Sequence, residues 1–311
     1  MTKIALGIDI GGTNTAVGVV DVKGNLLHRF SISTAKSAEA LVAEVKLTYE
    51  AIGLKNVSLE GIGIGAPNGN YYKGTVEFAP NLSWKGVVPL AEMFAKHFGV
   101  PAWLTNDANA AAIGEMQFGA AKGIKDFIMI TLGTGLGSGV VVNGEVVYGH
   151  DGFAGELGHI VYDYDGRSCG CGRKGCLETY ASATGIVRTA EEWLMKESVS
   201  SSLRTSGIIT AKSIAEAATA GDELAIEIFD FTAKVLGRQL ADAVAFTSPE
   251  TIFLFGGLAN AGELLMRPLK KHFEESLLQI FKGKIKLAFS ALPEGDAAVL
   301  GAASLAWHEL N

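Results

Sequence analysis

Every cysteine of the chain lies in one short stretch, residues 159–176, HIVYDYDGRSCGCGRKGC. Cys169 and Cys171 are separated by one residue, Cys176 follows after four more, and His159 stands ten positions before the first cysteine, with nine residues between them. Three thiolates and one imidazole are a ligand set that suits tetrahedral zinc. The spacing therefore predicts a zinc site. The alternatives are an incidental Cys-x-Cys pair and a pair of cysteines that oxidise.

The number of ligands indicates what this zinc would do. Four protein ligands leave no open position for water or substrate, which is typical of a structural site. Glycines between the cysteines let the backbone wrap tightly around the ion. We therefore interpret the predicted zinc as a brace for its loop, and we expect the chemistry to lie elsewhere.

Two glycine-rich turns, in DIGGTNT and TLGTGLGSG, could bind phosphate. Their backbone N–H groups can come close to phosphate oxygens, with the hydroxyls of Thr13, Thr15 and Thr134 beside them. No GxxxxGK[ST] motif is present and neither turn satisfies GxGxxG, which disfavours a P-loop and a Rossmann dinucleotide site. Either turn alone would be an ordinary hairpin turn, but both follow an apolar strand in the same way.

The elements around these turns repeat along the chain. Residues 4–10 and 16–20 are β-branched, apolar runs on either side of the first turn, and FIMITLGTGLGSGVVVNG repeats that order about 120 residues later. A second pair of buried strands, GIGIGAP and TIFLFGG, is preceded by predicted helices over 38–52 and 223–245. Further helices are predicted over 107–116 and 296–307, and an exposed loop over 197–209.

This order of elements predicts two α/β domains of similar plan, with a ligand in the cleft between them. The boundaries that we expect are 1–118 for the first domain, with a C-terminal helix over 296–311 packing back on it. The second and larger domain, 119–295, carries the zinc loop. A chain of 311 residues is long enough for two such cores.

Composition excludes several classes of function. A net charge of −7 argues against nucleic-acid binding, because such domains usually carry a basic face. No apolar run approaches the length of a membrane span, and the start of the sequence lacks the pattern of a signal peptide. Three clustered cysteines do not form a disulfide framework, so we expect a reducing, cytoplasmic location.

Four motifs together resemble a known family. DIGGTNTAVGVVD and TLGTGLGSGVVVNG are similar to the two phosphate motifs of the actin/hexokinase/sugar-kinase superfamily, and FGGLANAGE is similar to its adenosine motif. GFAGELGH followed by CGCGRKGCLETYAS resembles the signature of the ROK family (repressors, open reading frames and sugar kinases). The resemblance covers nearly the whole chain. It implies two duplicated ribonuclease-H-like, actin/hexokinase-type domains.

The resemblance also implies the ligands and the residues that bind them. ATP and Mg²⁺ would be bound by Asp9, Gly11, Gly12, Thr13, Gly133, Thr134, Gly135, Gly256, Gly257, Leu258 and Asn260. Asp9 would act on the metal through water, because Mg²⁺ keeps much of its hydration. Viewed alone, Asp9 could simply cap the turn that follows it.

The family further implies a catalytic base and a sugar site. Asp107, in LTNDANAAA, would accept the proton of a sugar hydroxyl, although by itself it looks like the N-cap of an alanine-rich helix. An aspartate with an ordinary pKa of about 3.9 would be ionised at neutral pH. The sugar would be bound by Gly65, Asn81, Asn106, Asp107, Glu156, His159 and Glu178. The metal ligands His159, Cys169, Cys171 and Cys176 would then hold the loop that carries Glu178.

One departure from the family pattern affects the choice of sugar. The segment GIGAPNGNYYKG has the expected Gly65 and Pro67, but it has Asn68-Gly69-Asn70 in the loop that would contact the sugar. The resemblance therefore implies ATP-dependent phosphorylation of a hexose, with glucose to glucose 6-phosphate as the first expectation and a homodimer as the family habit. The alternatives are a kinase for N-acetylglucosamine, N-acetylmannosamine, fructose or allose, a sugar-sensing regulator, and a non-enzymatic ATPase of the superfamily.

Overall fold

The computed structural model describes residues 1–195, 200–205, 207–293 and 295–310. They form two compact units. Unit 1 comprises Met1–Lys125, Gly144–Gly155 and Ser290–Asn311, and unit 2 comprises Asp126–Asn143 and Glu156–Phe289. The units divide the chain a few residues away from the expected boundaries of 118 and 295, and Gly144–Gly155 belongs with unit 1.

Unit 1 is built on a mixed sheet. Its strands are β1 (Thr2–Ile10), β2 (Asn14–Asp21), β3 (Leu26–Ser33), β4 (Val57–Gly65) and β8 (Ala102–Thr105), in the order β3-β2-β1-β4-β8. The first three are antiparallel neighbours, and β1, β4 and β8 are parallel. Short strands β5 (Gly69–Asn70), β6 (Thr75–Glu77) and β7 (Val87–Val88) form a second, small sheet, and β11 (Glu145–Val146) lies in the segment Gly144–Gly155.

Unit 2 repeats the plan of unit 1. Its strands β9 (Phe127–Leu132), β10 (Leu136–Val142), β12 (Thr251–Phe255) and β13 (Lys286–Phe289) run in the order β10-β9-β12-β13. As in unit 1, a hairpin of antiparallel strands continues into parallel strands. The predicted α/β fold with a duplicated sheet is confirmed: the apolar runs before the two glycine turns are β1 and β9, which are buried along most of their length.

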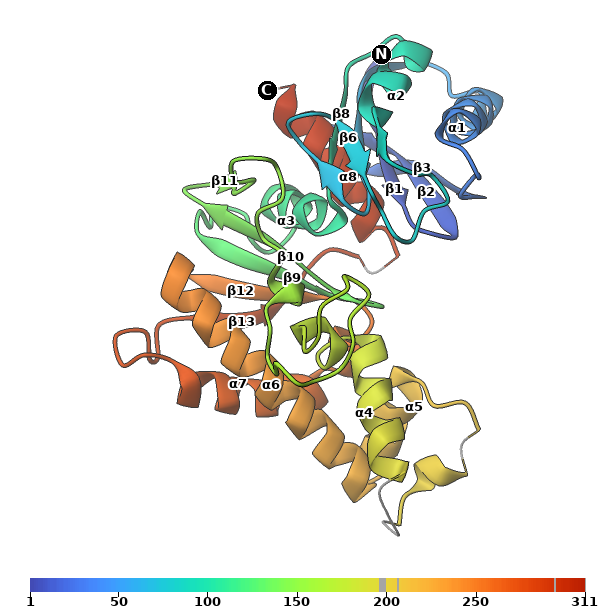
Figure 1. The fold of residues 1–311 in the computed structure, drawn as a ribbon. Coiled ribbons are helices and arrows are strands. Elements are labelled where there is room, and N and C mark those ends of the chain that lie inside the picture. Colours follow the sequence, from blue (N-terminus) through green and yellow to red (C-terminus); the bar gives the residue numbers. More distant parts are fainter. Residues whose placement is uncertain (196–199, 206, 294, 311) are drawn as a thin grey trace. The chain divides into compact units, whose positions relative to one another are not determined.

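The helices of unit 1 are α1 (Ala38–Ile52), α2 (Leu90–Phe98), α3 (Asp107–Phe118) and α8 (Ala297–Glu309) (Figure 1). Helix α8 packs against β1, β4 and α3. Glycines permit this close approach: a Cβ on Gly7 would lie 1.9 Å from Val299 O, and one on Gly63 would lie 1.8 Å from Ala302 O. The same helix supports α3 where Gly301 meets Gly114, so it helps to fix the helix that begins at Asp107.

The helices of unit 2 are α4 (Ala183–Met195), α5 (Ala211–Thr219), α6 (Glu223–Thr247) and α7 (Glu263–Ser276), and α6 and α7 lie side by side in Figure 1. Short 3₁₀ turns are η1 (Leu157–His159), η2 (Leu177–Thr179), η3 (Ser202–Arg204) and η4 (Ala259–Ala261). Part of the predicted loop 197–209 lies outside the described residues. The described part is not simply exposed, because η3 buries Leu203 in the apolar core of the unit.

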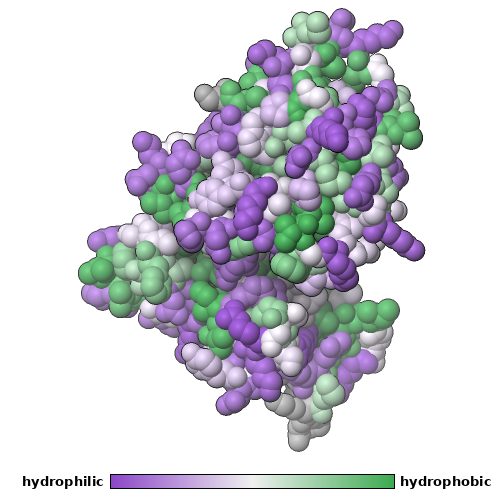
Figure 2. All heavy atoms as spheres, turned by 45° about the horizontal axis from the view of Figure 1, so that its top comes forward, coloured by the Kyte–Doolittle hydropathy of each residue, from purple (hydrophilic) through white to green (hydrophobic). Residues whose placement is uncertain are grey.

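The surface is mixed in character. Figure 2 shows hydrophilic residues spread over the face drawn, with hydrophobic residues in smaller groups between them. Among the described residues no helix is both long enough and apolar enough to cross a membrane.

Candidate functional site

Two carboxylates of unit 1 lie near each other at the carboxyl ends of parallel strands. Asp9 is close to the end of β1, and Asp107 begins α3 directly after β8. Gly65, the last residue of β4, separates them: a Cβ on it would lie 3.8 Å from Asp9 Oδ1 and 3.7 Å from Asp107 Cα. The strand ends therefore bring together three of the residues that the sequence assigned to the sugar and phosphate sites.

The start of α3 differs from the sequence interpretation in one respect. Asn106, and not Asp107, is the N-cap, since its Oδ1 accepts a hydrogen bond of 2.7 Å from Asn109 N. Asp107 is the first helical residue, and its Oδ1 accepts from Ala108 N at 2.8 Å. The prediction of Asp107 as the cap was wrong, because Asn is as good a capping residue as Asp and precedes it by one position. Asp107 is thus not needed to cap its helix.

Both carboxylates have raised pKa values. Burial, with the charge of Asp107 acting in the same direction and Arg29 opposing it, raises the pKa of Asp9 from 3.8 to about 6. Desolvation also raises the pKa of Asp107, and the Ala108 backbone N–H opposes it. Two carboxylates that repel each other favour a bound cation.

The first glycine turn, residues 11–13, is half-buried at Gly11 and exposed at Gly12 and Thr13, and Thr34 holds it by two hydrogen bonds. Thr34 Oγ1 donates to Gly11 O at 2.7 Å, and Thr34 N donates to Thr13 O at 2.8 Å. A Cβ on Gly12 would lie 2.7 Å from Asn81 O, so the turn packs directly on the backbone of Asn81. The residues of unit 1 that were predicted to bind phosphate and those predicted to bind sugar are therefore in contact.

The second glycine turn is anchored to the start of α4 in unit 2. Ala183 N donates to Gly133 O at 2.9 Å, and Thr184 Oγ1 donates to Thr134 O at 2.6 Å. The next residue, Gly135, faces the predicted sugar ligand: a Cβ there would lie 2.6 Å from Glu178 Oε2. A side chain at position 135 would displace the Glu178 carboxylate from its place against the turn.

Two adjoining hollows extend from this turn to the predicted adenosine motif. The first, of about 550 Å³, includes Thr134, and the second, of about 330 Å³, includes Gly257, Leu258 and Asn260. Both share Ala211 at the start of α5. Gly256 stands beside them with φ +101°, and a Cβ on it would lie 2.8 Å from Leu132 O. The hollows join the two parts of the predicted nucleotide site.

The first turns of α4 and α5 line these hollows as well, and sequence reasoning missed them. The additional lining residues are Ala183, Thr184, Val187, Arg188, Thr210, Lys212 and Ala215. One signal was available: Thr210-x-x-Ser213 forms a capping box that marks the start of α5. Nothing in the sequence indicated that this helix start would face the nucleotide motif.

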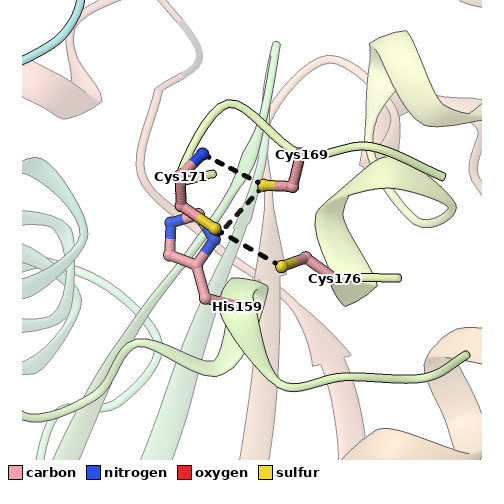
Figure 3. A group of neighbouring side chains, drawn as sticks. All are labelled: His159, Cys169, Cys171 and Cys176. Carbon is pink, nitrogen blue, oxygen red and sulfur yellow. Dashed lines mark hydrogen bonds between the residues drawn. The ribbon is translucent and has the colours of Figure 1, made fainter. Parts of the chain in front are cut away.

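The four predicted metal ligands converge. The ligand atoms of His159, Cys169, Cys171 and Cys176 all lie within 4.8 Å of one another, and the side chains point toward a common centre (Figure 3). Cys169 Sγ is 3.7 Å from His159 Nδ1, and Cys171 Sγ is 3.6 Å from Cys176 Sγ. Tetrahedral zinc with bonds of about 2.0–2.3 Å separates its ligand atoms by about 3.5–3.8 Å. The group fits zinc.

The thiols favour one negative charge near Arg173. Burial raises the pKa of Cys171, but hydrogen bonds from the Arg173 backbone N–H and from the neighbouring cysteines outweigh it and bring the pKa to about 6. Burial raises the pKa values of Cys169 and Cys176. A thiolate at Cys171 is ready to bind a metal ion, and bound zinc would deprotonate the other two.

The residues of unit 2 that were predicted to bind sugar lie next to this cluster. His159 turns Nδ1 toward the cysteines, while its Nε2 lies 4.0 Å from Glu156 Oε2. Glu178 Oε1 accepts from Cys169 Sγ at 2.9 Å and lies 3.7 Å from His159 Nδ1. The metal group and the predicted sugar carboxylates thus form one continuous set of contacts.

The loop that departs from the family pattern is ordered by its asparagines. Asn68 has φ +51°, and its Nδ2 donates to Glu77 O at 3.0 Å. Asn70 is fully buried and its Nδ2 donates to Asp151 O at 2.7 Å. The asparagines therefore fix the shape of this loop through backbone partners.

Comparisons with known proteins decide the family. The model of the ROK family matches residues 5–309. The chain belongs to the ROK family. It is 36% identical to a glucokinase of Thermotoga maritima over 98% of both chains, and 35% identical to a glucokinase of Halalkalibacterium halodurans over 98% of this chain and 96% of that one. A ROK family glucokinase from Streptomyces griseus, solved with glucose and AMPPNP, is similar at a TM-score of 0.82 and 36% identity, covering 97% of this chain and 98% of that one.

Proposed function

We propose that this protein is an ATP-dependent sugar kinase that converts glucose to glucose 6-phosphate. The observation that carries the proposal is the contact of Glu178 with Gly135. It joins a carboxylate suited to sugar hydroxyls to a turn that opens into the hollow leading to the adenosine motif. The glucose and AMPPNP bound by the Streptomyces griseus relative support the same pair of substrates.

Asp107 is the base in this proposal. A sugar hydroxyl is a poor nucleophile, and a carboxylate within hydrogen-bond reach accepts its proton as the phosphoryl group is transferred. The raised pKa of Asp107 makes it a stronger base than an ordinary aspartate. Asn81 and Asn106, which like Asp107 belong to unit 1, would orient the sugar. Glu156, His159 and Glu178 of unit 2 would also bind its hydroxyls.

Asp9 would hold the magnesium ion of Mg·ATP through water. Its mutual repulsion with Asp107 is relieved by a cation, which supports this assignment. When bound, the ion would neutralise negative charge on the phosphoryl group that is transferred. Residues 11–13 and 133–135 would bind phosphate oxygens with backbone N–H groups.

Zinc would be structural in this enzyme. The four ligands account for all its positions, so it would hold η1 and η2, and with them His159 and Glu178, rather than contact the reacting atoms. Three free thiols persist in a reducing compartment, which is why we propose a cytoplasmic location.

We also propose that units 1 and 2 are the two domains of the kinase and that the protein is a homodimer. In unit 2, Phe246 is 91% exposed and borders an apolar hollow of about 390 Å³ that Ile128, Val140 and Leu157 help to line. A protruding aromatic ring beside an apolar hollow makes a self-complementary face, as a two-fold dimer requires. Light scattering tests this proposal. We expect wild type to be a dimer and Phe246→Ser to be a monomer. A monomeric wild type would refute the dimer.

ADP release from Mg·ATP with a panel of sugars tests the proposed reaction. The panel compares glucose, mannose, fructose, allose, N-acetylglucosamine and N-acetylmannosamine. We expect the highest kcat/KM for glucose. A preference for an N-acetylhexosamine would overturn the substrate but keep the reaction, and it would point to the loop of Asn68 and Asn70. Release of ADP with none of these sugars would overturn the kinase proposal itself.

A further inference from the structure

Arg167 is a buried cation in the metal loop that is neither a metal ligand nor one of the expected site residues. It lies two positions before Cys169 and is only 8% exposed. Each of its five N–H donors has an acceptor. Nε donates to Glu192 Oε1 at 3.1 Å, Nη2 to Glu192 Oε2 at 2.6 Å and to Thr189 Oγ1 at 2.9 Å, and Nη1 to Thr179 O at 2.6 Å and to Gly185 O at 3.2 Å.

These contacts hold the turn that carries Glu178. Thr179 O, which accepts from Nη1, belongs to the residue next to Glu178, and the guanidinium lies 4.4 Å from the ring centre of Tyr180. The Tyr180 hydroxyl in turn accepts from Arg167 N at 3.1 Å. The turn is therefore fixed to Arg167 by its carbonyl, its ring and its hydroxyl.

The same guanidinium binds the helix that anchors the second phosphate turn. Gly185 O lies in the first turn of α4, next to Thr184, whose hydroxyl donates to Thr134 O. Glu192 lies further along α4 and also pairs with Arg188 at 3.4 Å. Arg167 thus connects the Glu178 turn to the helix that holds the phosphate turn, and Glu178 contacts that turn at Gly135.

Stability alone does not explain this arrangement. Buried ion pairs contribute little net stability and can often be replaced by apolar residues. The planar guanidinium, with five donors in a rigid arrangement, does however fix the relative positions of five acceptors. What it fixes in this structure is a carboxylate next to a phosphate turn.

We propose that Arg167 is a positioning residue that holds Glu178 against the 133–135 turn, with Glu192 as its partner. The proposal rests on the proposed function, since it concerns the sugar carboxylate of that site. It also gives the metal loop a second support that works without the ion: zinc holds the loop at the cysteines, and Arg167 holds it at Thr179 and α4.

Two variants test the assignment. Arg167→Lys keeps the charge but loses the fork, and Glu192→Gln keeps one acceptor but loses the charge of the pair. We expect KM for the sugar to rise about tenfold in Arg167→Lys and a few-fold in Glu192→Gln, because Glu178 would no longer be aligned to hydrogen-bond the sugar. We expect kcat to change by less than about threefold in both. Zinc content measured by mass spectrometry should stay at one ion per chain in both.

Glu250→Gln is the matched control. It makes the same chemical change in unit 2, but Glu250 forms an exposed pair with Lys286 at 3.8 Å. Its sugar KM should equal that of wild type. Hydrogen exchange gives a readout that needs no turnover: the amides of Tyr180 and Ala181, both bonded to Leu177 O, should exchange faster in Arg167→Lys, while those in the centre of α6 should not.

The possible outcomes separate the two proposals. Wild type that phosphorylates no sugar contradicts the proposed function, whatever the variants do. Active wild type with unchanged sugar KM and unchanged exchange in Arg167→Lys overturns the role of Arg167. Loss of zinc in proportion to the loss of activity also overturns it, because the residue would then act only through the metal site.

Discussion

The two glycine turns occupy the same place in two sheets of the same plan, yet different side chains flank them. Two residues before the first turn, β1 places Asp9 beside Gly65 of β4; at the equivalent position β9 places Thr131 beside Phe255 of β12. Unit 1 holds the ionisable pair Asp9 and Asp107, and unit 2 holds the thiol cluster with Glu178. The duplicated plan provides the same scaffold twice, and different side chains at equivalent positions give the two units different chemical properties.

The largest effect is expected at the base in unit 1. Asp107→Asn should lower kcat by about 10²–10⁴-fold, because the hydroxyl proton loses its acceptor. The melting temperature should not fall, since Asn106 is the residue that caps α3. Steady-state kinetics and calorimetry on one preparation check this. A large drop in melting temperature would show that Asp107 is structural, as the cysteines of unit 2 are expected to be.

The second effect concerns the brace in unit 2. Cys171→Ser should lose about 10–100-fold or more in zinc affinity, lower the melting temperature and raise the sugar KM, because η2 loses one of its two supports. Chelator competition and thermal melts measure it. Normal melting and normal sugar affinity in this variant would mean that the cysteine group is incidental.

A third comparison is made within a single turn. Gly135→Ala places a methyl group 2.6 Å from Glu178 Oε2, whereas a Cβ on Gly133 meets nothing within 4 Å. Gly135→Ala should raise the sugar KM by about tenfold, and Gly133→Ala should leave it unchanged. Equal sugar KM values for the two variants would contradict the position of Glu178.

The smallest effect is a gain in stability at Asp9. Its pKa of about 6 lies above 3.8, so the native state binds more protons than the unfolded state between these pH values, and stability falls as pH rises through that window. Asp9→Asn removes this cost and should raise the free energy of unfolding at pH 7 by about 1–3 kcal/mol. Urea titrations at pH 4 and pH 7 measure it; an equal change at both would contradict the shift. In wild type, kcat/KM should fall as pH drops below about 6.

Local patterns predicted the scaffold and the metal group well. The strand repeat is visible because apolar runs end in glycine, and the helix over 38–52 has the bounds of α1 because Ser37 and Gly53 mark its ends. The four predicted metal ligands lie in one short stretch, so their spacing alone indicated that they would lie together. Other features depend on contacts between residues distant in sequence: the starts of α4 and α5 beside the adenosine motif, the assignment of Gly144–Gly155 to unit 1, and the five acceptors around Arg167. A local sequence pattern does not reveal such contacts.

Transfer of a phosphoryl group from ATP to a sugar hydroxyl is the proposed reaction of this protein. Phosphorus NMR of wild type incubated with glucose and Mg·ATP, with the products quantified, measures that transfer. We expect glucose 6-phosphate and ADP in equal amounts. ADP with inorganic phosphate and unchanged glucose, or no consumption of ATP by folded protein that contains zinc, would contradict it.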